Sequence, residues 1–126
     1  MDADGMRALA KRFFDAVEAG DIDAVRAIYA PDAVIWHNTD GVEQTPDQNL
    51  ETLRGFVRLI EERRYLDRRV QVSGAGFTQQ HVLHGVRRDG TQVSLPCCIV
   101  CEVKDGRITR LDEYFDSAAV AKFIGS

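Results

Sequence analysis

The sequence has little of several features that mark specialised classes of protein. Among its 126 residues are three cysteines, three prolines and one tryptophan, and no apolar run approaches the roughly 20 residues needed to span a bilayer. The opening residues, Met1 to Asp4, lack the basic start and apolar segment of a secretory signal. The net charge of -4 is modest and both signs are interspersed, which argues against a nucleic-acid or acidic-membrane surface. We therefore expect a cytoplasmic protein with no nucleic-acid and no membrane partner.

The cysteines fall close together in one predicted strand, and their odd number favours reduced thiols. Cys98 and Cys101 have the spacing of a metal-binding pair. Residues three apart on a strand point to opposite faces, however, so these two cannot share one ion. The three histidines show no compact ligand set with Glu113 either. We predict no metal and no cofactor, and we interpret the cysteines as small core or interface residues.

Helical patterns dominate the first half of the chain. Apolar residues at helical spacing predict a helix from Met6 to Val17 that Gly20 ends, and Asp21 can cap a short second helix. A strand of marked β propensity is predicted over residues 33–38. Thr45-Pro46-Asp47-Gln48 is a capping box with proline at the first helical position, so a third helix begins there.

The second half reads as four strands from Tyr65 onward. Turn signals at residues 74–76, 89–90 and 105–106 separate them, and the last two are Asp-Gly pairs that favour tight hairpins. Asp116-Ser117 can cap a final short helix. The order ααβα-ββββ-α predicts one α+β domain over residues 1–126, with helices packed on one face of a mostly antiparallel sheet.

Glu113 stands on an apolar face of the last predicted strand. Because successive strand residues point to opposite faces, it shares its face with Leu111 and Phe115. A carboxylate placed there is costly to bury unless it is paired or protonated, and groups placed in this way are often functional. The sequence therefore suggests a cavity with chemistry in it. The alternative is a glutamate at a rim that simply reaches water.

A two-residue turn at Asp105-Gly106 predicts which side chains share that face. It pairs Cys98 with Glu113, and directly paired residues point the same way. One face then includes Cys98, Val100, Leu111, Glu113 and Phe115, and the other includes Ile99, Cys101 and Ile108. Both faces are substantially apolar, so the sheet needs two covers. Helices can cover one, and we expect a homodimer partner to cover the second, through the face that bears Ile99, Cys101 and Ile108.

Two histidines compete for the position beside Glu113. A two-residue turn at Asp89-Gly90 would place His81 on the face of Glu113, whereas a three-residue turn with a bulge would place Val82 and His84 there. Counting without a gap from Gly76 favours His84, and we take His84 as the partner of Glu113. A histidine beside a carboxylate is a general-base arrangement suited to neutral pH.

The end of the first strand supplies further candidates. His37 and Asn38 follow Trp36 there, and Trp36 shares the face of Asn38. We interpret Trp36 either as a cavity wall or as ordinary core packing, because a buried indole serves in both ways.

Two segments resemble the nuclear transport factor 2-like superfamily. They are residues 19–34, which read AGDIDAVRAIYAPDAV, and residues 105–116, with Asp105-Gly106-Arg107-Ile108 and then Glu113-Tyr114-Phe115-Asp116. The element order agrees along nearly the whole chain. The superfamily includes SnoaL-like polyketide cyclases, ketosteroid isomerases and limonene epoxide hydrolases. The resemblance implies a cone-shaped α+β barrel with a deep apolar pocket, commonly dimeric.

The resemblance also carries implications for individual residues. Trp36-His37-Asn38 looks like the aromatic-x-Asn signature with which limonene epoxide hydrolases hold their water, and Glu113 occupies the place of their last-strand Asp. Their Arg-x-Asp pair would fall on Val82 and His84, so the family's acid is replaced by a histidine.

Ketosteroid isomerases match less closely. Their base would fall at about His37 and their oxyanion tyrosine on Phe13, so the donors of an oxyanion hole are missing from those positions. The cyclases need only one acidic or basic group in an apolar pocket, and this chain meets that demand.

The sequence thus predicts a cofactor-independent acid–base enzyme that acts on a small apolar or cyclic molecule. The rival hypothesis is a non-catalytic module that binds a small hydrophobic ligand or assembles as a dimer. The predicted catalytic residues are Glu113, His84, Asn38 and His37, and the predicted substrate-binding residues are Trp36, Phe13, Val82, Cys98, Val100, Leu111 and Phe115.

Overall fold

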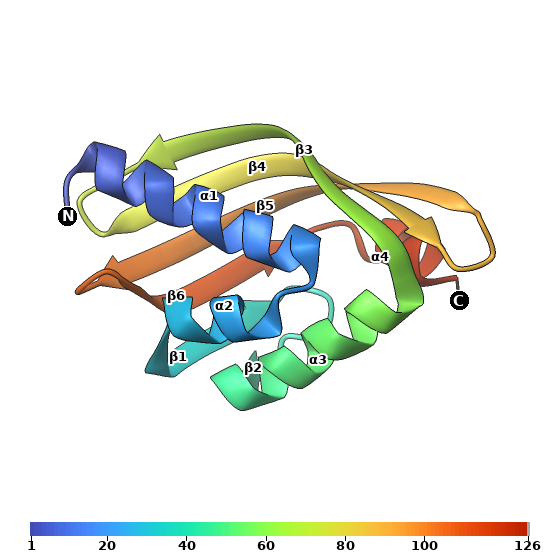
Figure 1. Cartoon of the computed structure of the whole chain (residues 1–126), viewed down its shortest axis with the longest axis horizontal. Helices are drawn as coiled ribbons and strands as arrows, with labels where there is room; N and C mark the ends of the chain where they lie inside the picture. Colours follow the sequence, from blue (N-terminus) through green and yellow to red (C-terminus); the bar gives the residue numbers. More distant parts are fainter. Residues whose placement is uncertain (126) are drawn as a thin grey trace.

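The computed structural model describes residues 1–125 and shows four helices and six strands within them (Figure 1). The helices are α1 (Ala3–Ala19), α2 (Ile22–Ile28), α3 (Pro46–Leu59) and α4 (Ser117–Ile124). The strands are β1 (Tyr29–His37), β2 (Glu43–Gln44), β3 (Ile60–Val72), β4 (Gly76–Arg87), β5 (Gln92–Lys104) and β6 (Arg107–Tyr114). They form one sheet in the order β2-β1-β6-β5-β4-β3, which is antiparallel except between β1 and β6. The predicted α+β fold is confirmed.

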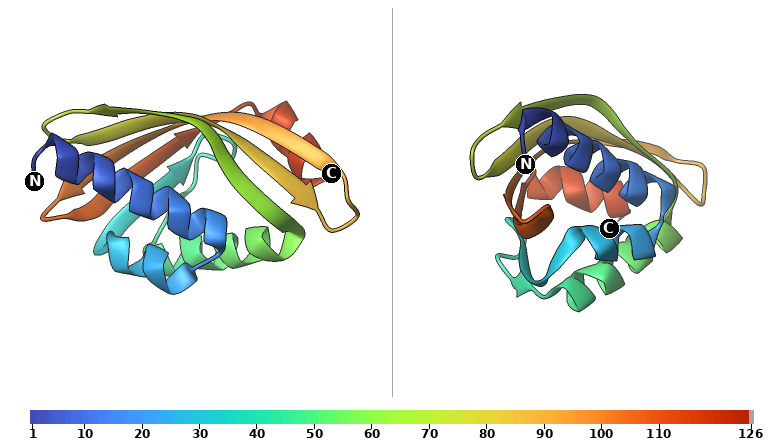
Figure 2. Two further views of the ribbon diagram at one scale, coloured as in Figure 1. Left: turned by 45° about the horizontal axis from the view of Figure 1, so that its top comes forward. Right: turned by 60° about the vertical axis from the view of Figure 1, so that its left-hand side comes forward.

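The sheet is long and curved, and α1, α2 and α3 lie against its concave side (Figure 2). Helix α1 contacts β3 and β4, α3 contacts β1 and β3, and α4 contacts β5 near the far end of the sheet. Leu9 and Phe14 of α1 are almost fully buried. Each such side chain contributes about 1.5–3 kcal/mol of hydrophobic stabilisation. The core therefore lies between the helices and the concave face. No helix among residues 1–125 is long and apolar enough to cross a membrane.

The local signals for helix ends are realised. The Thr45 side chain accepts a hydrogen bond from the Gln48 backbone, and the Gln48 side chain accepts one from the Thr45 backbone. Gly20 ends α1 in the left-handed conformation, with φ of 72°, which glycine adopts without a steric penalty. Strand β3, in contrast, begins at Ile60 and not at the expected Tyr65. Ile60 is fully buried, so tertiary packing continues the strand through a charged segment.

The pairing of β5 with β6 differs from the prediction by one residue. The two-residue turn at Asp105-Gly106 forms as expected and pairs Val103 with Ile108. Thr109 is then an extra residue, because Glu102 pairs with Arg110. Beyond this β-bulge the pairing of β5 with β6 is shifted by one residue, so each residue of β6 shares a face with the other set of β5 residues. Glu113 consequently pairs with Ile99, and the prediction that it pairs with Cys98 is wrong.

The same bulge corrects the predicted dimer face. Ile99, Cys101 and Ile108 are each at most 3% exposed and belong to the core that includes Leu9 and Phe13 of α1. They are therefore covered by helices of their own chain. The prediction that a second subunit covers these three residues is wrong, and the face left open by the helices is the opposite one.

Candidate functional site

A cavity of about 370 Å³ opens between α3, α4 and the concave face of the sheet. Much of its wall is apolar, with Leu53 and Phe56 from α3, Leu83 and Leu95 from the sheet, and Phe115 and Phe123 from the C-terminal segment. A group of polar side chains interrupts this wall: His37, Asn49, Tyr65, Cys97 and Glu113. Ligand pockets of proteins are commonly of this kind, with apolar walls and a few convergent polar groups.

Glu113 and His37 form an ion pair at the cavity wall. They are directly paired residues of the parallel strands β1 and β6, so both side chains point to the same face. Nε2 of His37 lies 3.1 Å from Oε1 of Glu113, and the side chains are only 18% and 19% exposed. The sequence prediction that Glu113 faces a cavity is consistent with this geometry, and its partner is His37 from the neighbouring strand.

The environment of His37 favours its charged form. Burial works to lower the pKa of this imidazole, but the hydrogen bond with Glu113 and the charges of Glu113 and Asp40 raise it by more. The net result is that the pKa of His37 lies above its ordinary value of 6.5. His37 can therefore hold a proton beside the carboxylate at neutral pH.

His81 is the second histidine that points inward. It is 3% exposed, and it pairs with Cys97 across β4 and β5. Its Nδ1 lies 2.9 Å from Nε2 of the fully buried Gln79. Burial is the main cause that lowers the pKa of His81 to about 4, so this imidazole is neutral at pH 7. The two histidines near Glu113 thus favour opposite protonation states.

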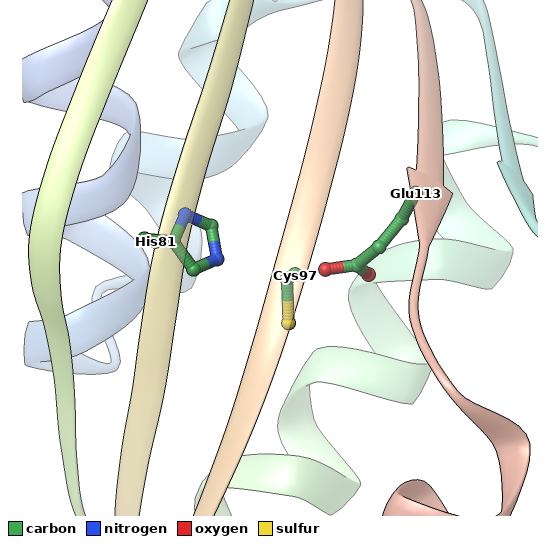
Figure 3. A group of neighbouring side chains, drawn as sticks. All are labelled: His81, Cys97 and Glu113. Atoms are coloured by element: carbon green, nitrogen blue, oxygen red, sulfur yellow. The ribbon is translucent and has the colours of Figure 1, made fainter.

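His81, Cys97 and Glu113 come together on three adjacent strands, β4, β5 and β6 (Figure 3). Their potential ligand atoms all lie within 4.8 Å of one another. Burial and then the charge of Glu113 raise the pKa of the Cys97 thiol, so the free thiol stays protonated. This group was not predicted from the sequence, because the expected pairing of the last two strands puts Cys97 on the opposite face from Glu113.

A chain of hydrogen bonds lies beside the cavity. The Tyr29 hydroxyl donates to Oδ1 of Asn49 over 2.7 Å, and Nδ2 of Asn49 donates to Oε1 of Gln44 over 3.2 Å. Asn49 is only 3% exposed. In the sequence, Asn49 stands directly before Leu50 of the apolar stripe of α3, and this position is the signal that could have identified Asn49 as a buried polar residue. This network fixes the first turn of α3 against β1 and β2.

His84 does not face Glu113, so the prediction of His84 as its partner is wrong. His84 pairs with Ser94 on the other face of the sheet, and its Nδ1 lies 3.2 Å from the Ser94 hydroxyl. The hairpin does have three loop residues, because Arg87 bonds to Thr91 across the turn. This extra residue and the bulge at Thr109 each shift the register by one, and the two shifts cancel. His81 therefore points to the side of Glu113.

Asn38 and Trp36 lie on the outer side of β1. Both amide atoms of the Asn38 side chain bond to the backbone of Phe115, over 3.0 and 3.1 Å. Trp36 packs edge-on against Tyr114, with ring centroids 5.3 Å apart. Neither residue lines the cavity. The similarity of Trp36-His37-Asn38 to the water-holding signature of limonene epoxide hydrolases is thus not supported by the geometry.

The remaining predicted substrate-binding residues divide among three places. Phe115 lines the cavity, and its role in substrate binding stays a prediction. Phe13 and Leu111 are buried in the core and are absent from the cavity wall. Val82, Cys98 and Val100 project from the opposite face of the sheet, because their neighbours His81, Cys97 and Ile99 project inward. The predicted placement of Cys98 and Val100 beside Glu113 is wrong because the bulge at Thr109 shifts the pairing of β5 with β6 by one residue.

Comparisons with known proteins agree with this architecture. Residues 10–111 match the family model of the SnoaL-like domain. The chain belongs to the SnoaL-like family. No curated protein matches the sequence at a significant level.

Solved structures with the same fold include three bacterial proteins. A candidate polyketide cyclase from Xanthomonas campestris pv. campestris is 22% identical, with a TM-score of 0.83 over 97% of this chain and 96% of that one. An NTF2-like protein of unknown function from Burkholderia pseudomallei is 20% identical, with a TM-score of 0.85 over the whole of both chains. A hypothetical protein with a ketosteroid isomerase-like fold from Catenulispora acidiphila, solved in complex with trimethylamine, is 17% identical, with a TM-score of 0.81 over 93% of this chain and 92% of that one. At these identities the likeness establishes the shared fold of this SnoaL-like chain and nothing finer.

Proposed function

We propose that this SnoaL-like protein is an acid–base enzyme that moves a proton on a small, largely apolar cyclic molecule, with Glu113 as the general base. The observation that carries the proposal is the His37–Glu113 pair at the wall of an otherwise mostly apolar cavity. Burial of a carboxylate costs free energy, and carboxylates in such places are often functional. The candidate cyclase among the structural neighbours supports the same class of reaction.

The substrate class follows from the cavity. Its volume of about 370 Å³ lies near the lower end of the roughly 300–1,000 Å³ typical of small-molecule pockets. Aromatic and leucine side chains would hold a flat or cyclic body, while His37 and Glu113 meet its polar edge. An enolisable ketone fits this division, because its reacting C–H lies beside a carbonyl.

The chemistry assigns one role to each member of the pair. An oxygen of Glu113 takes a proton from the carbon beside the carbonyl, and the electron pair of that C–H bond moves into an enolate. His37, in its protonated form, donates a hydrogen bond or a proton to the enolate oxygen. Isomerisation follows if the proton returns to another carbon. Cyclisation follows if the enolate carbon attacks a second carbonyl, whose oxygen then takes the proton.

Deuterium exchange tests the base directly, without knowledge of the natural product. Cyclic ketones with a single carbonyl group, which exchange slowly without a catalyst, are incubated with the protein in D2O, and loss of the α-proton signal is followed by NMR. We expect the wild-type chain to catalyse exchange for at least one probe and Glu113→Gln to lose about 10²–10⁴ of that rate. Glu102→Gln, an exposed glutamate on the neighbouring strand, is the matched control. Binding of a probe without exchange would favour the rival function, a non-catalytic ligand-binding module.

We also propose that the chain forms a homodimer through the outer face of its sheet. That face carries an aromatic pair, Trp36 and Tyr114, and Tyr114 and Val100 are 43% and 38% exposed. Burial of this surface would stabilise a dimer by about 25 cal/mol for each Å² of apolar area. Sedimentation should show a dimer for the wild-type chain and dissociation in Tyr114→Glu. A wild-type monomer at high concentration would refute the proposal.

A further inference from the structure

We propose that His81, Cys97 and Glu113 form a binding site for one Zn²⁺ ion, and that the bound zinc inhibits the enzyme by taking up its base. The second half of this proposal rests on the proposed function, because it assumes that Glu113 is the base. The first half, metal binding, stands on the geometry of the three side chains alone. The three come from adjacent strands, and their ligand atoms lie within 4.8 Å of one another (Figure 3).

An unsatisfied atom marks the position of the site. Nε2 of His81 is buried and has no hydrogen-bond partner among the described residues, and the whole side chain is 3% exposed. A buried polar atom without a partner is destabilising, because it has given up its hydrogen bonds to water for nothing in return. A metal ion bound at Nε2 would remove that cost. The Cys97 thiol has only a weak partner, the Leu95 carbonyl at 3.4 Å, so it is available to the same ion.

The spacing suits zinc after a small adjustment. Zinc bonds of about 2.0–2.3 Å in a tetrahedral arrangement place neighbouring ligand atoms about 3.3–3.8 Å apart. The three atoms must therefore draw together by about 1 Å. Rotation of the Cys97 and Glu113 side chains can supply this movement, because both line the cavity and neither is held by packing on every side.

Two further residues, Gln79 and His37, already lie where they can orient the proposed zinc ligands by hydrogen bonds. Gln79 contacts Nδ1 of His81 over 2.9 Å, and rotation of its amide by a half turn would present the oxygen as acceptor for an Nδ1 proton. His37 contacts Oε1 of Glu113 over 3.1 Å. Metal-binding histidines and carboxylates are usually oriented by hydrogen bonds of this kind.

The mixture of donors selects the metal. One imidazole nitrogen, one sulfur and one carboxylate favour zinc over magnesium or calcium, which prefer oxygen ligands alone. Binding requires the thiol to release its proton: Cys–SH and Zn²⁺ give Cys–S–Zn⁺ and H⁺. The thiolate and the carboxylate together neutralise the divalent charge, so the filled site carries no net charge. This balance removes the main obstacle to placing an ion in a buried position.

Inhibition follows from the use of Glu113. Oε1 of Glu113 is held by His37, so binding of the other carboxylate oxygen to zinc would leave Glu113 no free oxygen to accept a proton from carbon. Because Cys97 and Glu113 both line the cavity, the ion would also stand at the wall where the substrate must place its reacting edge. We expect zinc to lower the rate of deuterium exchange and a chelator to restore it.

Cobalt(II) provides the test of binding, because a Co²⁺–thiolate bond gives an intense near-ultraviolet charge-transfer band. Metal-free protein is titrated with Co²⁺ and then with Zn²⁺, which should displace it. We expect one equivalent of Co²⁺ to produce the band in the wild-type chain, and Cys97→Ser and His81→Phe to abolish or weaken it at least tenfold. Cys98→Ser and His84→Phe are matched controls, since these residues lie on the same strands but face outward.

Absence of the band from the wild-type chain, or its loss in Cys98→Ser with retention in Cys97→Ser, would overturn the site. If His81→Phe does not fold, Cys97→Ser decides the question. The binding arm needs no activity, so failure of the proposed function leaves it intact. If the band forms but zinc leaves exchange unchanged or increases it, the inhibitory role is refuted.

Discussion

Protonation of His81 should dominate the loss of stability between pH 7 and pH 4. In the folded chain burial lowers the pKa of this imidazole from 6.5 to about 4. The unfolded chain binds the proton at pH values below 6.5, while the folded chain resists it until about pH 4. The unfolded state therefore binds more protons in this window, and the free energy of unfolding rises with pH through it.

The size of the effect follows from the shift. A difference of about 2.5 pKa units corresponds to about 3 kcal/mol, since one unit is worth about 1.4 kcal/mol. His37 acts in a different window, because its pKa is raised in the folded state. Its stabilisation is complete below pH 6.5 and is lost as the pH rises through its folded value. The two histidines can thus be separated by pH alone.

Denaturant unfolding at several pH values, with a chelator present, measures this directly. Wild-type protein is compared with His81→Gln, which removes the titrating group. Between pH 7 and pH 4 the wild-type chain should lose about 3 kcal/mol more free energy of unfolding than the variant. His84→Gln, which removes an outward histidine, should behave as wild type. Equal losses in wild type and His81→Gln would refute the claim that His81 is buried in its neutral form.

Three further predictions concern packing, hydrogen bonding and the ion pair. A Cβ atom at Gly85 would lie 2.8 Å from the Phe123 ring and 2.9 Å from Ile60. Gly85→Ala should therefore displace α4 and lower the free energy of unfolding, measured by denaturation, by about 1–3 kcal/mol. Unchanged stability would contradict this packing. Asn38→Ala removes two hydrogen bonds to the backbone of Phe115 and should lower the free energy of unfolding by about 1–3 kcal/mol. Deuterium exchange should continue in this variant. Loss of exchange in the folded variant would instead assign Asn38 a direct role in the reaction. The pKa of His37, followed by NMR titration, should fall in Glu113→Gln, since the charge and hydrogen bond of Glu113 raise it; no change would show that the two side chains do not interact.

The fold was predictable because its signals are local. Thr45 and Gln48 form their capping box from residues three apart, and the Asp105-Gly106 turn needs only its own backbone conformation. Asp105 and Gly106 both have positive φ, at 53° and 76°, as a tight hairpin of this kind requires. Such signals do not depend on the rest of the chain.

The faces of the strands were not predictable, because register depends on single extra residues. Thr109 forms a bulge that no residue pattern indicates, and the sequence left open whether the loop at Asp89-Gly90 has two residues or, with Arg88, three. Each extra residue exchanges the inner and outer faces of everything beyond it. Glu113 was found because its own strand alternates regularly. The three-residue loop behind the choice of His84 does form, so Cys97 and His81 were misplaced because of the bulge at Thr109 alone.

The central claim is that Glu113 acts as a base and not merely as a wall of the cavity. One pair of measurements on Glu113→Gln tests it most directly: the dissociation constant of a ketone probe and the rate of its deuterium exchange, in metal-free protein. Glutamine keeps the size and hydrogen bonding of the side chain but cannot accept the proton. We predict binding within a few-fold of wild type and exchange slower by about 10²–10⁴. Exchange at the wild-type rate in the folded variant would contradict the claim.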